Sequence, residues 1–95
     1  LILASNRGHA SLARQLLESG CAINEKNLAG NTALMEASKE GHLEAVKLLL
    51  EKGADPQIRN NKRELAHTMV AENRTDIKKV FNSHKGEWNW LSDIF

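Results

Sequence analysis

Residues 30–55, GNTALMEASKEGHLEAVKLLLEKGAD, contain two short helical patterns separated by a glycine. The first pattern places small or apolar side chains at i, i+1, i+4 and i+5, which predicts a short helix with a narrow inward face. Its inward residues are Ala33, Leu34, Ala37 and Ser38. After Gly41 a wider apolar stripe predicts a second helix, which ends near Gly53 as a left-handed C-cap. The inward residues of this second helix are Ala45, Val46, Leu49 and Leu50. The stretch therefore predicts a helix-turn-helix unit.

The same unit recurs when the sequence is aligned with itself at an offset of 33 residues. Ten of the 27 aligned positions are identical, whereas about two are expected by chance at ordinary residue frequencies. The identical residues of the first unit are Leu1, Ala4, Ser5, Gly8, His9, Leu16, Leu17, Glu18, Gly20 and Asn27. A period of this length is typical of stacked-repeat architectures.

Between the units lies a polar segment, such as residues 54–62, ADPQIRNNK, whose turn-forming residues predict a hairpin-like finger. The middle unit resembles ankyrin repeats, with the family pattern G-x-T-(P/A)-L-x-x-A-x-x-x-G-H-x-x-x-V-x-x-L-L-x-x-G-A-D. The matching residues are Gly30, Thr32, Ala33, Leu34, Ala37, Gly41, His42, Val46, Leu49, Leu50, Gly53, Ala54 and Asp55. The resemblance covers most of residues 1–81. It implies an all-α ankyrin-repeat solenoid of about three stacked helix-turn-helix units with short finger loops.

We interpret residues 1–95 as a single ankyrin-repeat domain in four parts. Residues 1–29 are a partial first repeat without its opening turn, so we expect the chain to begin inside a repeat of a longer array. Residues 30–62 are the full middle repeat. Residues 63–86 are a degenerate C-terminal capping repeat, in which the apolar helix faces are shifted in register and Arg74 stands where the inter-helix glycine is expected. Residues 87–95 are a Trp-rich tail.

Composition indicates the compartment and excludes several classes of partner. The single cysteine, Cys21, cannot form an internal disulfide, so we expect a reducing compartment, the cytoplasm or nucleus. Apolar runs are too short to cross a bilayer, and we predict no membrane insertion. Aromatic side chains do not interleave with the basic residues of the second finger, so we predict no nucleic-acid binding. For the basic residues of that finger and of the segment after it, which are Arg59, Lys62, Arg63, Lys78 and Lys79, we favour ordinary solvation over an acidic partner.

No catalytic, cofactor or metal site is predicted. His9 and His42 lie one repeat apart at the same family position, where the resemblance implies hydrogen bonding between repeats, and zinc-ligand spacing is absent. Cys21 aligns with Ala54, so we interpret it as a packing residue rather than a nucleophile. Catalytic Ser/His/Asp arrangements and phosphate-binding glycine loops are absent. We therefore expect a protein that is not an enzyme and takes no cofactor or small-molecule substrate.

The resemblance implies a protein-binding scaffold whose concave side is formed by the finger tips and the short helices. The first candidate partner contacts are Leu28 and Ala29, which are at solvent-facing family positions of the finger tip. The residues expected to extend this patch are Asn31, Met35, Lys39 and Glu40 of the middle unit, Asn6 and Arg7 of the first unit, and Arg59, Asn61 and Lys62 of the second finger. The expected function is non-catalytic binding of a partner protein or peptide. The alternative is a regulatory or positioning fragment of a larger multidomain enzyme or channel.

Two further features are the C-terminal tail and Asn24 of the first finger. The tail is expected to fold back onto the third repeat; the alternatives are continuation into another domain, docking on a partner and self-association. Its candidate contact residues are Trp88, Trp90, Leu91 and Phe95. In the first finger, Asn24 follows Leu16 by eight residues, which resembles the hydroxylation site of some ankyrin repeats. The family asparagine is usually structural, so we expect Asn24 mainly to brace the finger.

Overall fold

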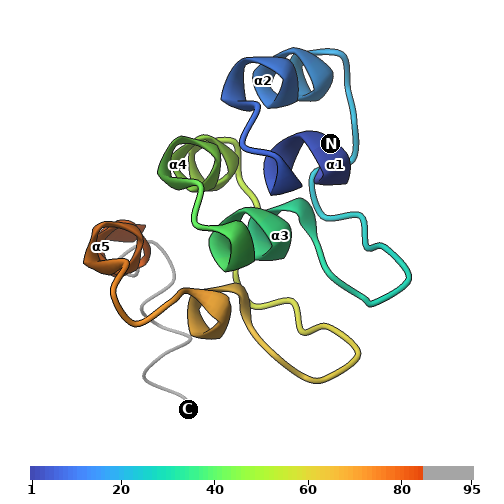
Figure 1. The fold of residues 1–95 in the computed structure, drawn as a ribbon. Helices are drawn as coiled ribbons and strands as arrows, with labels where there is room; N and C mark the ends of the chain where they lie inside the picture. The colour runs from blue at the N-terminus through green and yellow to red at the C-terminus, as the bar shows by residue number, and fades with distance from the viewer. Residues whose placement is uncertain (85–95) are drawn as a thin grey trace.

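A computed structural model describes residues 1–84 of the chain, and these form three helix pairs (Figure 1). In chain order the helices are α1 (Ile2–Asn6), α2 (Ala10–Glu18), α3 (Ala33–Glu40), α4 (Leu43–Glu51), the 3-10 helix η1 (Ala66–Met69) and α5 (Thr75–His84). Helices α1, α3 and η1 lie in one layer, and α2, α4 and α5 lie in the other. The predicted all-α stack of about three helix-turn-helix units is confirmed.

Helix α3 lies at the centre of the layer of short helices, between α1 and η1. It begins at the N-cap Thr32, whose Oγ1 accepts a hydrogen bond from the backbone nitrogen of Met35 at 3.3 Å. It ends at Gly41, which takes the left-handed conformation with φ of 77°. Residues 33–38 are all buried, and the small side chains of Ala33 and Ala37 allow the neighbouring segments to approach closely. The predicted inward residues are therefore buried, but the buried face is wider than predicted, because Met35 and Glu36 are buried as well.

The apolar core runs along the stack between the two layers. Val46 and Leu49 of α4 are completely buried beside Leu34 of α3, and Ile77 and Phe81 of α5 extend the same cluster. A smaller cluster joins Leu48 to Ala4 and Ala13 of the first unit. Burial of each large aliphatic side chain contributes about 2 kcal/mol, and each of the two clusters is built from more than one unit. The stack is therefore held together by contacts that no single unit makes alone.

Close approach of neighbouring units explains two of the glycines. The imidazole of His42 lies against Gly8, where a Cβ atom would be 2.6 Å from Nδ1 of His42. The guanidinium of Arg74 lies against Gly41 in the same way, with 2.7 Å between that Cβ position and Nη1. The expected hydrogen bond of His42 between repeats is thus replaced by a packing contact. The expected place of Arg74 was also wrong by one residue, because it is the counterpart of His42 rather than of the glycine.

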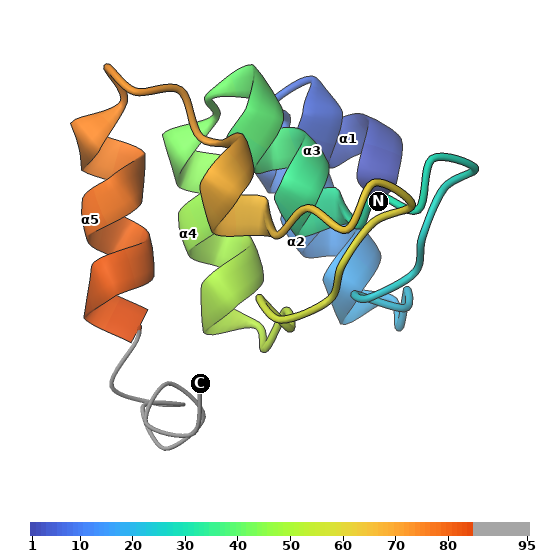
Figure 2. The ribbon, with the colours of Figure 1, turned by 90° about the horizontal axis from the view of Figure 1, so that it is seen from below.

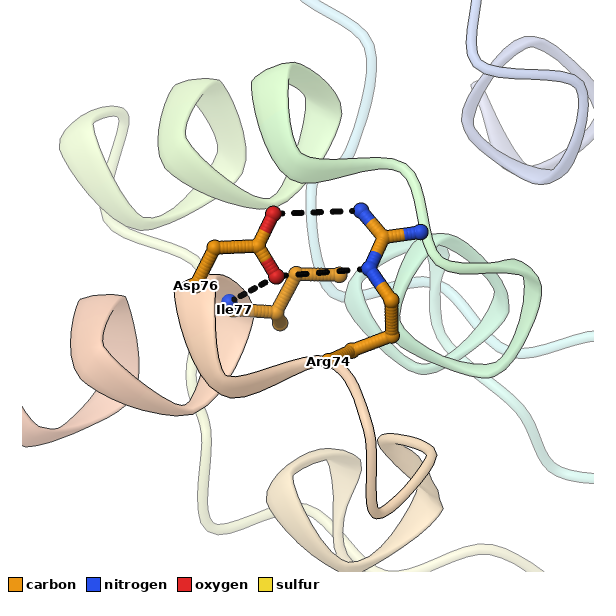
Figure 3. Close-up of polar contacts among 3 residues, drawn as sticks. All are labelled: Arg74, Asp76 and Ile77. Carbon is orange, nitrogen blue, oxygen red and sulfur yellow. Dashed lines mark hydrogen bonds and ion pairs between the residues drawn. The ribbon is translucent and has the colours of Figure 1, made fainter.

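Arg74 also organises the start of α5, as Figure 3 shows. Its Nε and Nη2 donate to Oδ1 and Oδ2 of Asp76 at 3.3 and 3.2 Å, and Asp76 Oδ1 accepts a further bond from the nitrogen of Ile77 at 2.9 Å. These contacts, the Arg74 hydrogen bonds first, hold the pKa of Asp76 below its ordinary value of 3.8. The negative charge of Asp76 in the first turn also interacts favourably with the positive end of the helix dipole.

The third unit departs from the first two at its short helix. In the sequence, the shifted apolar face of this short helix consists of Leu65, Ala66, Met69 and Val70. The structure has only the 3-10 helix η1 there, and Val70 is already extended. Thr68 holds this turn, because its Oγ1 donates to the oxygen of Leu65 at 2.7 Å and accepts from the nitrogen of Leu65 at 3.2 Å. Ala66 and Val70 are nevertheless buried, so the predicted inward positions are partly retained.

The length and apolar character of the helices decide whether any of them could cross a membrane. Within residues 1–84 no helix combines the length and the apolar character needed to cross a bilayer.

Candidate partner-binding surface

Two fingers project beside the short helices, residues 20–31 between α2 and α3 and residues 53–64 between α4 and η1 (Figure 2). Each ends in a tight four-residue turn. The nitrogen of Gly30 donates to the oxygen of Asn27 at 2.9 Å, and the nitrogen of Arg63 donates to the oxygen of Asn60 at 2.9 Å. The predicted hairpin-like fingers are therefore present.

An asparagine side chain braces each turn from inside. Oδ1 of Asn27 accepts bonds from the nitrogens of Ala29 and Asn31, both at 3.0 Å. One repeat later, Oδ1 of Asn60 accepts bonds from the nitrogens of residues 62 and 64 at 2.9 and 2.8 Å. Because a side-chain carbonyl takes two backbone donors in each finger, the tips are fixed before any partner arrives.

The two fingers are also tied to one another. The backbone nitrogen of Asn61 donates to the oxygen of Ala29 at 3.1 Å, and Nδ2 of Asn61 donates to the oxygen of Leu28 at 2.8 Å. Gly30 makes this approach possible, because a Cβ atom there would lie 2.6 Å from Oδ1 of Asn61. The finger tips consequently form one continuous surface.

A buried polar network lies beneath the tips and joins the first unit to the middle unit. Nδ2 of Asn60 donates to Oδ1 of Asn31 at 2.8 Å, and Nδ2 of Asn31 donates to Oε2 of Glu36 at 2.6 Å. The other carboxylate oxygen of Glu36 accepts a bond from Nδ2 of Asn6 at 2.7 Å. An ionised carboxylate only accepts hydrogen bonds, so Glu36 fixes which way each neighbouring amide points. This network was not predicted from the sequence, where the recurrence of Asn27 as Asn60 is its one visible signal.

A groove of about 670 Å³ opens between the second finger and the helices α3 and η1. It is lined by Ala29, Asn31, Lys39, Asn60, Asn61, Lys62, Glu64, Thr68 and Met69. The residues at its base include the buried amides of Asn31 and Asn60, and both lysines are exposed. Glu64, Thr68 and Met69 were not predicted to contribute, because the predicted contacts come only from residues 1–62.

The groove collects some of the predicted contact residues and leaves others apart. Ala29, Lys39, Asn61 and Lys62 are exposed in its lining, whereas exposed Arg7, Leu28, Glu40 and Arg59 lie outside it. Leu28 is 100% exposed at the tip of the first finger. That these residues contact a partner remains a prediction.

Three of the predicted contacts need correction. Asn31 and Met35 are only 6% and 1% exposed, because α3 is covered on both sides by α1 and η1. Asn6 is half-buried, and its amide is committed to Glu36. Met35 therefore supports the surface from within, and Asn31 contributes only its largely buried side chain to the lining of the groove.

The remaining predictions concern residues apart from the groove. Asn24 is exposed and its Oδ1 accepts a bond from the nitrogen of Asp55 at 2.9 Å, so it links the two fingers; its hydroxylation remains a prediction. Cys21 is exposed, so its interpretation as a packing residue was wrong.

The tail residues Trp88, Trp90, Leu91 and Phe95 lie outside the described residues. Residues 1–84 contain no group of three or more His, Cys, Asp or Glu side chains placed to hold a metal ion.

Comparison with known proteins identifies the family to which this architecture corresponds. The family described as ankyrin repeats (3 copies) matches residues 1–60. The ankyrin repeat and KH domain-containing protein mask-1 of Caenorhabditis elegans is 38% identical over 80 residues, which cover 84% of this chain and 3% of that protein. E3 ubiquitin-protein ligase XBAT33 of Arabidopsis thaliana is 44% identical over 50 residues, 53% of this chain and 10% of the ligase.

The crystal structure of the ankyrin repeat protein EF0377 superimposes with a TM-score of 0.81 and 37% identity, covering 86% of this chain and 45% of that one. The chain thus corresponds to a small part of each of these sequence relatives and to less than half of this structural neighbour. The repeat period, the stacked helix pairs and these matches agree: the chain belongs to the ankyrin repeat family, whose repeats are general protein–protein interaction modules.

Proposed function

We propose that this chain is a non-catalytic scaffold that binds a partner protein or peptide through its finger tips and the adjoining groove. The observation that carries the proposal is the tie between the fingers, in which Asn61 holds both Ala29 and Leu28 of the neighbouring tip. A surface fixed in this way loses little conformational entropy when a partner docks.

Leu28 supports the same conclusion. Single exposed apolar side chains are common on protein surfaces and need no explanation. Leu28 differs because it is 100% exposed on a turn whose carbonyl is held by Asn61. Burying this side chain in a pocket of a partner would contribute about 2 kcal/mol, with almost no backbone left to order.

The test is affinity capture from cell extract, identification of the retained protein, and titration of that purified protein by calorimetry. Three forms are compared: wild type, Leu28→Arg/Ala29→Arg, and the matched control Ser11→Arg/Leu12→Arg. The control adds the same two charges to α2, in the layer opposite the short helices. We expect the finger variant to lose the partner and the control to retain it, with all three equally helical by circular dichroism. Retention by the finger variant would contradict the proposal.

A second candidate function is suggested by the relatives. Several of them are named E3 ubiquitin-protein ligases, and the matched region is about a tenth of their length. We propose as the alternative that the repeats position another part of a longer protein. Sequencing the full-length transcript decides this, because a catalytic domain encoded in the same reading frame would support the alternative and its absence would exclude it.

A further inference from the structure

We infer that the groove takes an acidic segment of the partner protein, with carboxylate side chains against Lys39 and Lys62. This inference rests on the proposed function and adds the chemistry of the partner to it. It starts from the fact that Lys39, at the end of α3, and Lys62, in the second finger, line the same groove although they are far apart in sequence.

The charges within the groove are not balanced by the chain itself. In the described part of the chain the ion pairs are Arg74 with Asp76 and Lys78 with Glu72, so neither Lys39 nor Lys62 is paired there. The single carboxylate in the lining, Glu64, already accepts a bond from Nδ2 of Asn60 at 3.0 Å. The groove thus presents two exposed ammonium groups against one engaged carboxylate, and complementary charge is what such a surface selects.

The basic residues of the second finger and of α5 have different surroundings in the structure. From sequence alone they suggested an ordinary solvated face. The structure separates them, because Lys78 is paired with Glu72 on α5, while Lys62 lies in the groove with Lys39, which was not counted among them. Convergence of a lysine from α3 and a lysine from the second finger on one concavity is a feature that a solvated face does not require.

The other lining residues favour a peptide over a nucleic acid. Met69 and Ala29 offer apolar contact, and Thr68 and Asn61 offer polar contact, but the lining contains no aromatic side chain on which a base could stack. An extended acidic segment that alternates carboxylate and aliphatic side chains fits these groups.

The experiment uses short fluorescein-labelled peptide pools and fluorescence anisotropy. One pool carries Asp and Glu among Leu, Ala and Ser, a second carries Asn and Gln at the same positions, and labelled oligothymidylate is the nucleic-acid probe. We expect the acidic pool to bind wild type at least about tenfold more tightly than the amide pool, with an affinity that falls as salt rises.

Variants locate the site. Lys39→Glu/Lys62→Glu is expected to weaken the acidic pool by at least about tenfold, and the neutral pair Lys39→Gln/Lys62→Gln by an intermediate factor. The matched control, Lys47→Glu/Lys52→Glu, reverses two exposed lysines of α4 and its C-cap, outside the groove, and should bind as wild type does. Helicity by circular dichroism confirms that each variant is folded.

Several outcomes overturn the inference. These are no measurable binding of the acidic pool, equal binding of both pools, equal losses in the groove and control variants, or preference for oligothymidylate. The proposed function is judged separately by the captured partner. A partner that is lost by Leu28→Arg/Ala29→Arg but kept by Lys39→Glu/Lys62→Glu leaves the scaffold function standing and removes the acidic segment.

Discussion

Asn61 of the second finger donates its side-chain amide to the carbonyl of Leu28 in the first finger at 2.8 Å, and so holds the tip that carries the most exposed leucine of the described residues. The contact joins consecutive repeats at their most projecting points. It depends on Gly30, which leaves room for Asn61, and on the bracing of each turn by its own asparagine. The finger surface is therefore a product of stacking rather than of either finger alone.

Asn60→Ala should destabilise the protein more than Asn27→Ala. Asn60 is buried, accepts two backbone bonds and donates to Asn31 and Glu64, so its loss leaves buried polar groups unpaired and costs about 3 kcal/mol. Asn27 makes the same two turn bonds in an exposed position, where water replaces them, and its loss costs about 1 kcal/mol. Urea unfolding followed by circular dichroism measures both, and equal losses would show that the buried network adds nothing.

Gly30→Ala should destabilise the protein more than Gly53→Ala. Both glycines have positive φ, 80° and 92°, so alanine introduces left-handed strain of about 1 kcal/mol at either position. At Gly30 the new Cβ would also lie 2.7 Å from the backbone nitrogen of Asn61, whereas nothing lies within 4 Å at Gly53. The difference between the two unfolding free energies isolates the finger contact, and no difference would argue against close packing of the fingers.

Arg63→Gly should stabilise the protein. Arg63 has φ of 64° at the position that Gly30 occupies one repeat earlier, and it is the one non-glycine residue with positive φ in the described chain. Glycine removes strain of about 1 kcal/mol, partly offset by the greater freedom of glycine in the unfolded chain. Lys62→Gly, in the same turn but without positive φ, should destabilise. Thermal unfolding of both variants checks the opposite signs, and a fall in the melting temperature of Arg63→Gly would be the contrary result.

Asp76→Asn should lower stability at neutral pH but not in strong acid. The Arg74 hydrogen bonds hold the pKa of Asp76 in the folded protein below the ordinary 3.8. The stabilisation is therefore complete above that value and is lost as the pH falls through the lower, folded-state pKa. The effect is small because the carboxylate is exposed. The melting temperatures of the variant and of wild type should differ at neutral pH and converge in strong acid. A difference in melting temperature that is equal under the two conditions would rule out this linkage.

Much of the fold follows from residue spacing. The period of 33 residues and the small inward side chains of Ala33 and Ala37 specify helix pairs that stack, and the structure has them. The third unit was harder, because its short helix is a single 3-10 turn held by Thr68 and its register is shifted so that Arg74 takes the place of a histidine. A side chain bound to a local backbone group competes with helix formation in a way that apolar spacing does not reveal.

The site was predicted less completely, for a physical reason. Met35 was predicted as a surface contact, but the neighbouring units cover it. The network through Asn6, Glu36 and Asn31 joins residues as far as 30 apart, and nothing in one unit marks them as partners. Residues that face between units depend on the neighbouring unit, whereas the finger tip Leu28 projects from the stack and was identified correctly as exposed.

The most direct test of the central claim is amide hydrogen exchange of the chain, free and bound to its captured partner. We expect the backbone N–H groups of Asn31 and Asn61 to be protected already in the free protein, because they are hydrogen-bonded within and between the fingers. Binding should then add protection at residues 27–30 and 60–63 and in η1. Added protection confined to α2, α4 and α5, with unprotected fingers in the free protein, would contradict a preformed binding surface on the finger side of the stack.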